Sequence, residues 1–166
     1  MPTLHTVLTD PAAAGIYRVP ARFSVAAVTR RIASTDVRFA LLSGNGITDK
    51  ATLLRATADA LAFPPYFGRN WDAFADCLTD LSWLPAPGHA ILYDNPAPFI
   101  SQSPQDWATA VEIFGAAAER WRVAGVPFTL LLRRAAGLAT TIPLLAEQLC
   151  LSSRNCTQDN HRPTLS

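Results

Sequence analysis

The chain has 166 residues, of which 49% are hydrophobic and 16% are charged, and its formal net charge at pH 7 is +1. This composition is typical of a globular domain with a real core, and it excludes a disordered chain. Three cysteines without metal-ligand spacing, no apolar run of membrane-spanning length and no signal-like N-terminus lead us to expect a cytoplasmic protein that keeps its thiols reduced.

Residues 1–36 have the character of an N-terminal extension. Asp10-Pro11 predicts a turn, and residues 16–19 are a candidate for a short strand. Residues 24–33 predict a helix, with Arg30 and Arg31 in its last turn, where cations suit the helix dipole.

Residues 37–133 have the pattern of an α/β domain. Short apolar runs predict three buried strands, at residues 37–42, 89–93 and 126–132. Helices are predicted at residues 49–62, from Trp71 onward, and between Ser103 and Gly125, with Asp106 completing a box-like capping pattern. Residues 94–103 predict a loop. Because the strands are continuously hydrophobic and alternate with helices, we expect a small three-stranded parallel sheet packed with helices.

Residues 134–166 have the character of a C-terminal extension. The sequence predicts a helix around residues 144–149, followed by a polar tail that frays.

The helix predicted from Trp71 combines an acidic stripe with an apolar one. Asp72, Asp76 and Asp80 follow at i, i+4 and i+8, so their carboxylates stack along one face. Apolar side chains at i, i+3, i+7 and i+10 point in nearly the opposite direction: Trp71, Phe74, Leu78 and Leu81. Neighbouring like charges destabilise a helix by about 0.2–0.5 kcal/mol per pair, so the acidic stripe lowers the stability of the helix that carries it.

Negative charge extends well beyond this helix. Residues 70–119 contain no Lys or Arg and carry seven acids: Asp72, Asp76, Asp80, Asp94, Asp106, Glu112 and Glu119. Such a field repels nucleic acid and attracts cationic surfaces. The alternative interpretation is an ordinary solubilising surface.

The motif around this helix resembles the barstar family, the intracellular inhibitors of secreted bacterial ribonucleases of the barnase type. The shared order of residue types comprises Pro64, Tyr66, Phe67, Gly68, Asn70, Trp71, Asp72, Ala73, Phe74, Asp76, Cys77, Leu78 and Thr79. The strand and helix pattern agrees with the family from about residue 37 to residue 133. The resemblance implies a barstar-like fold and an inhibitor of the immunity or antitoxin type.

In the barstar family, the loop and helix that match this motif block the ribonuclease active site. The resemblance implies that Asp76 takes the place of a substrate phosphate and that Asp72 pairs with a further basic residue. It implies that Tyr66 packs on the catalytic histidine, that Gly68 allows close backbone approach and that Asn70 caps the helix. The expected partner-binding residues are Tyr66, Phe67, Gly68, Asn70, Asp72, Ala73, Asp76, Thr79 and Asp80.

The chain departs from the family pattern at several positions. Arg69 stands where the family has an acid, and Ala75 stands where it has a tryptophan. Asp80 and Leu81 replace a Gly-Trp pair, and Glu119 lies close to a family glutamate without matching its position. The expected partner is a cationic secreted ribonuclease or a toxin nuclease domain, and a toxin nuclease other than barnase itself would account for these departures.

Two other functions are compatible with the sequence. Paired aspartates could serve a glycoside hydrolase, but they lie on a convex helix face and no metal or phosphate-loop motif accompanies them. A barstar-like module could instead bind a partner that is not a ribonuclease. We expect no cofactor, no metal, no membrane association and no catalytic residue. Tyr66 and Phe67 could also simply close the core, as Trp71 and Phe74 do, and Cys77 has the character of a buried thiol.

Overall fold

The computed structural model describes residues 1–136, 138 and 141–146. Its centre is a four-stranded, all-parallel sheet in the order β1-β4-β3-β2. The strands are β1 (Ile16–Val19), β2 (Arg38–Ser43), β3 (His89–Asp94) and β4 (Phe128–Arg133). The expected α/β class and parallel sheet are therefore confirmed, with one strand more than the three expected.

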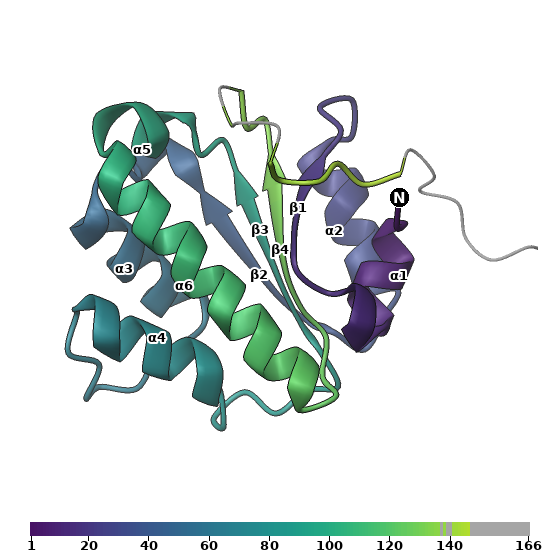
Figure 1. Ribbon diagram of the computed structural model, residues 1–166, viewed down its shortest axis with the longest axis horizontal. Coiled ribbons are helices and arrows are strands. Elements are labelled where there is room, and N and C mark those ends of the chain that lie inside the picture. The colour runs from purple at the N-terminus through teal and green to yellow at the C-terminus, as the bar shows by residue number, and fades with distance from the viewer. Residues whose placement is uncertain (137, 139–140, 147–166) are drawn as a thin grey trace, which may run out of the picture.

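Helices cover both faces of the sheet (Figure 1). The described residues contain six α-helices: α1 (Leu4–Thr9), α2 (Val25–Ala33), α3 (Lys50–Ala60), α4 (Trp71–Asp80), α5 (Ala97–Gln102) and α6 (Pro104–Val123). Two short 3₁₀ turns, Pro11–Ala13 and Gly44–Gly46, complete the regular structure. None of the helices in the described ranges combines the length and the apolar character that a membrane crossing requires.

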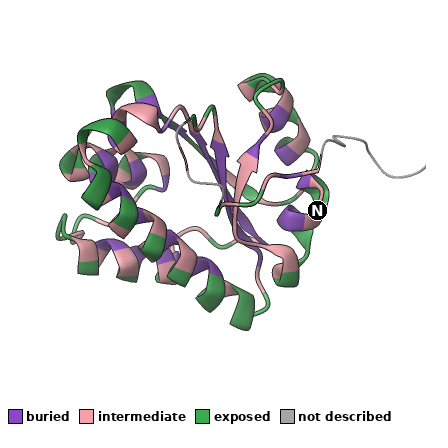
Figure 2. Ribbon diagram, turned by 45° about the horizontal axis from the view of Figure 1, so that its top comes forward, coloured by how far each residue is buried: buried purple, intermediate pink, exposed green. Residues whose placement is uncertain are grey.

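The central strands β3 and β4 are almost wholly buried because helices cover both faces of the sheet, whereas the edge strand β2 alternates between buried and exposed residues (Figure 2). In β3, Ile91 and Tyr93 belong to the larger core, on the side of α3, α4 and α6. Ala90 and Leu92 alternate with them and belong to a second core, on the side of α1 and α2. Successive side chains of a strand point to opposite faces, so one run of six residues supplies both cores.

Residues 1–36 contribute to this sheet. β1 pairs in parallel with β4, and Ile16 lies opposite Leu130. Helices α1 and α2 close the second core with side chains such as Val7 and Val28, both fully buried. The segment that the sequence indicated as an extension thus supplies an edge strand and one helical layer.

Other predicted elements agree with the structure to within a few residues. Gly125 ends α6 in the left-handed region at φ 76°, where glycine carries no steric penalty. The expected loop at residues 94–103 was wrong in part, because it contains α5, with Pro96 and Pro98 tolerated at its start. Ser103 is the N-cap residue of α6, as expected, but its side chain makes no capping bond: its hydroxyl donates to the Thr48 carbonyl at 2.9 Å, and no capping box forms with Asp106.

The predicted helix at residues 144–149 is also wrong over the residues described. Residues 144–146 are not helical: Leu144 forms a parallel bridge with Arg18 along the outer edge of β1. The Leu145 N–H donates to the Arg18 carbonyl at 2.9 Å and the Ala146 N–H to the Pro2 carbonyl at 3.0 Å, so these amides bond β1 and the N-terminus and not a helical turn of their own. Residues 147–149, and Cys150 and Cys156, lie outside the described residues.

Candidate functional site

Helix α4 begins with a complete N-terminal cap. The Asn70 side-chain oxygen accepts from the Ala73 N–H at 2.8 Å, which satisfies one of the free amides of the first turn. Asp72 lies in that first turn, where a negative charge favours the helix dipole. Leu81 ends the helix in the left-handed region at φ 44°. The ends of α4 are therefore fixed by its own residues.

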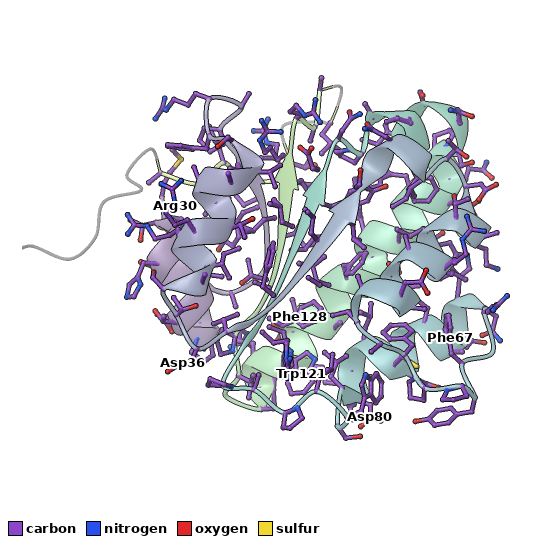
Figure 3. The ribbon with its side chains drawn as sticks, turned by 180° about the vertical axis from the view of Figure 1, so that it is seen from behind. Arg30, Asp36, Phe67, Asp80, Trp121 and Phe128 are labelled. Carbon is purple, nitrogen blue, oxygen red and sulfur yellow. The ribbon has the colours of Figure 1, made fainter. Side chains whose placement is uncertain are left out.

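The inner face of α4 is anchored in the larger core. Phe74 is fully buried and makes an edge-on contact with Phe114 of α6, with ring centroids 5.5 Å apart. The indole N–H of Trp121 in α6 donates to the Leu78 carbonyl at 2.8 Å, and Trp121 lies inward of Asp80 in Figure 3. Helix α4 is thus held against α6 at both its middle and its end.

The outer face of α4 carries the acidic ridge, which we define as Asp72, Asp76 and Asp80. All three residues are exposed. Within the described residues no Lys or Arg forms an ion pair with any of them, whereas Asp94 and Glu119 both pair with arginines. The ridge therefore presents three uncompensated negative charges on a rigid support.

The loop of residues 62–70 leads into the ridge and is tied to the core by aromatic rings. Phe63 packs edge-on against Phe67 and Trp83, with centroids 5.0 and 5.9 Å away. The Phe67 N–H donates to the Pro64 carbonyl at 3.0 Å, which closes a turn. Tyr66, at the tip of this turn, is 75% exposed. The core-closing interpretation thus fits Phe67, which is half-buried, but not Tyr66.

The end of the loop combines glycine with a strained arginine. A Cβ atom on Gly68 would lie 3.1 Å from the Asn70 side-chain nitrogen, so a larger residue there would press on the α4 cap. Arg69 adopts φ 52°, a left-handed conformation that non-glycine residues rarely adopt. It is exposed, and it places a cation immediately before the acidic ridge.

The expected partner-binding residues form one continuous surface, because the loop runs directly into α4. Six of the nine are exposed: Tyr66, Gly68, Asn70, Asp72, Asp76 and Asp80. The other three are half-buried: Phe67, Ala73 and Thr79. The Thr79 hydroxyl donates to the carbonyls of Ala75 and Asp76, at 2.9 and 3.1 Å, within its own helix.

A shallow pocket of about 200 Å³ lies beside this surface, and sequence reasoning did not identify it. Arg55 and Asp59 of α3 line it together with Phe67 and Arg69 of the loop. Nearby, the Lys50 ammonium lies 5.3 Å from the centre of the Trp71 ring. No local signal in the sequence could have predicted these contacts, because they join α3 to residues beyond Pro64 and Pro65, where the direction of the chain changes.

The remaining titratable groups do not suggest catalysis. Burial raises the pKa of the Cys77 thiol, and the charges of Asp76 and Asp80 raise it further. A hydrogen bond from Arg122 lowers the pKa of Glu119, whose charge is thereby matched. Among the residues described, no group of three or more His, Cys, Asp or Glu side chains could hold a metal ion.

Comparison with known protein families gives a match over the central part of the chain. The family described as Barstar (barnase inhibitor) matches residues 37–133, which is more than half of the chain. No curated protein matches it. The matched segment contains the 62–70 loop and the acidic ridge.

Proposed function

The chain belongs to the barstar family of barnase inhibitors, and from this premise we propose that its acidic ridge and 62–70 loop block the active site of a cationic, barnase-like ribonuclease or toxin nuclease domain. The family consists of inhibitors and not of enzymes, which excludes the hydrolase alternative. The proposed role is that of an immunity protein or antitoxin acting in the cytoplasm of a bacterium.

The observation that carries the proposal is the lack of internal partners for the acidic ridge. Asp72, Asp76 and Asp80 are exposed and form no ion pair within the described residues. A ribonuclease cleft must be cationic to hold phosphates, and a carboxylate on a rigid helix offers similar charge and acceptor oxygens without a bond to cleave. Because α4 is capped and packed, binding requires little reordering of this surface.

The residues of this surface have distinct proposed roles. Asp76, in the middle of the ridge, replaces a substrate phosphate among the enzyme's basic side chains. Asp72 pairs with a second basic group. Tyr66 packs its ring on the catalytic histidine, which its 75% exposure in the free protein allows. Asn70 caps the helix through its bond to the Ala73 N–H and so holds the end of the loop against the first turn of α4.

Asp80 and Arg69 give the surface two different ends. Asp80 lies in the last turn of α4, where it would act at the rim of the cleft and mainly speed association. Arg69 places a positive charge at the other end, next to the pocket lined by Arg55. A cognate nuclease would therefore carry an uncharged group opposite Arg69 and cations opposite the ridge.

The test is an inhibition titration with the full chain. Purified barnase and a panel of toxin ribonuclease domains are assayed on RNA at fixed enzyme concentration, with wild-type protein and with the Asp76→Ala and Asp36→Asn variants. Asp36 is an exposed acid on the side of the molecule that carries α2 (Figure 3), so it is the matched control. We expect stoichiometric inhibition of at least one ribonuclease by the wild type and by Asp36→Asn, and weak inhibition by Asp76→Ala.

Two results would contradict the proposal. Equal inhibition by Asp76→Ala and the wild type would remove the ridge from the interface. Failure to bind or inhibit any ribonuclease in the panel would favour the alternative, a barstar-fold module with another kind of partner.

A further inference from the structure

A second charged cluster lies at the carboxyl ends of the strands, away from α4 (Figure 1). Arg18 is in β1, Arg133 is the last residue of β4 and Arg134 follows it. Asp94, the last residue of β3, is opposite Arg133 in the sheet register. In open parallel sheets this edge is where small ligands usually bind.

Asp94 does not neutralise the whole cluster. Its carboxylate accepts from the Arg133 guanidinium at 2.6 Å and from two nitrogens of Arg134 at 2.7 and 3.1 Å. Burial favours the protonated form, but these hydrogen bonds and charges prevail and lower the Asp94 pKa. One carboxylate thus serves two guanidinium groups, and it forms no ion pair with Arg18.

Arg18 has two terminal nitrogens without a hydrogen-bond partner among the described residues. Its Nε donates to the Ile142 carbonyl at 2.8 Å, which fixes the direction of the side chain. Within the part of the chain that the structure describes, its two terminal nitrogens have no hydrogen-bond acceptor and no carboxylate pairs with it. The side chain is also half-buried, so its charge is less well hydrated than that of a surface arginine.

The arginines border a pocket of about 540 Å³. Arg18 and Arg134 provide its polar edge, whereas its walls are mainly apolar and include Val19, Leu132 and Leu144. This size falls in the range of about 300–1,000 Å³ that small-molecule sites occupy. A pocket with apolar walls and two guanidinium groups suits a molecule with an apolar body and an anionic head.

We propose that this pocket binds a small organic phosphate. The phosphate accepts from the two terminal nitrogens of Arg18, in the forked geometry that guanidinium and phosphate share, and from the remaining terminal nitrogen of Arg134. The apolar body of the ligand lies against Leu132, Val19 and Leu144. Such a site is independent of the proposed ribonuclease interface, since Arg18 comes from outside the matched family segment and the strand ends that border the pocket lie away from α4 (Figure 1).

The test is titration of the isotope-labelled full chain at low ionic strength, followed by amide chemical shifts. The two probes are phosphate esters: AMP, which is a nucleotide, and hexyl phosphate, which is aliphatic. Inorganic phosphate tests the anionic head without a body, and adenosine tests the body of AMP without its phosphate. We expect saturable shifts at residues 18–21 and 132–136 with at least one ester, and weaker binding of either fragment. The ester that binds more tightly identifies the source of the phosphate.

Variants then locate the site. Arg18→Gln and Arg134→Gln should each weaken the ester by about tenfold or more, Arg18→Lys should weaken it less than Arg18→Gln, and Arg120→Gln should leave it unchanged. Arg120 is an exposed arginine of α6 outside this pocket, so it controls for net charge. If Arg18→Gln does not fold, Arg134→Gln and Arg18→Lys keep the test intact. The proposal would be overturned if millimolar ester produced no saturable shifts, or produced them only at other residues. Full affinity in Arg18→Gln and Arg134→Gln would overturn it as well.

Discussion

Replacing Asp76 by asparagine should make the protein more stable and a worse inhibitor at the same time. Asp76 lies one helical turn from both Asp72 and Asp80, and no cation within the described residues compensates it. Asparagine keeps the shape of the side chain and removes two like-charge pairs of about 0.2–0.5 kcal/mol each. Stability should rise by about 0.4–1 kcal/mol, or about 1–4 °C in Tm for a domain of this size.

Binding should change in the opposite direction and by a larger amount. Truncating one partner of a buried charge pair at an interface costs about 2–5 kcal/mol, which weakens Kd by roughly 30-fold to several thousand-fold. Thermal denaturation measures the first effect, and calorimetric titration with the inhibited ribonuclease measures the second. Asp36→Asn, which changes an exposed acid outside α4, should leave Kd nearly unchanged.

The reasoning would be refuted by a lower Tm together with an unchanged Kd for Asp76→Asn. A lower Tm would mean that the carboxylate stabilises the fold through a contact of its own. An unchanged Kd would mean that the nuclease binds elsewhere.

Four further predictions test the surface and its support. Tyr66→Ala should weaken ribonuclease binding at least tenfold with no loss of Tm, because the ring is 75% exposed; equal Kd values for variant and wild type would place it outside the interface. Arg69→Glu should raise the association rate with a cationic ribonuclease at low salt and make that rate depend more steeply on salt, as measured by stopped flow. A slower rate would contradict this prediction and would reveal an acid opposite residue 69. Phe74→Ala should cost about 3–5 kcal/mol in chemical denaturation, since the ring is fully buried against Phe114, and a loss below about 1 kcal/mol would show that α4 is not held by this contact. Burial, assisted by the charge of Arg38, lowers the pKa of His89 in the folded protein. As the pH falls below about 6.5 the imidazole is therefore protonated more readily in the unfolded state, and the free energy of unfolding should decrease. His89→Gln should show a smaller decrease of stability with falling pH in denaturation curves, and the same pH dependence as the wild type would contradict this prediction.

Local signals in the sequence were sufficient for most of the elements. The two stripes of the α4 segment predicted both its buried and its exposed face, because helix periodicity converts spacing directly into direction. Asn70 predicted where the helix begins, and its side chain does bond the Ala73 N–H. The apolar strands and the helices between them predicted a parallel sheet packed with helices, which the structure confirms.

Long-range pairing was beyond the reach of these signals. The four residues of β1 pair with β4, more than a hundred residues later, and a short apolar run does not specify its neighbour. The Ser103 hydroxyl bonds Thr48 instead of capping α6, a choice decided by tertiary contact. For the same reason the sequence showed neither the pocket beside Arg69 nor the cluster around Asp94, each of which joins residues from separate elements.

Hydrogen exchange of the full chain, alone and bound to the ribonuclease that it inhibits, tests the central claim most directly. That claim is that the 62–70 loop and the acidic ridge form the contact surface. We expect binding to slow exchange mainly in residues 64–80, with α1 and α2 unchanged. Protection confined to α1, α2 or the strand ends, with residues 64–80 exchanging as in the free protein, would contradict it.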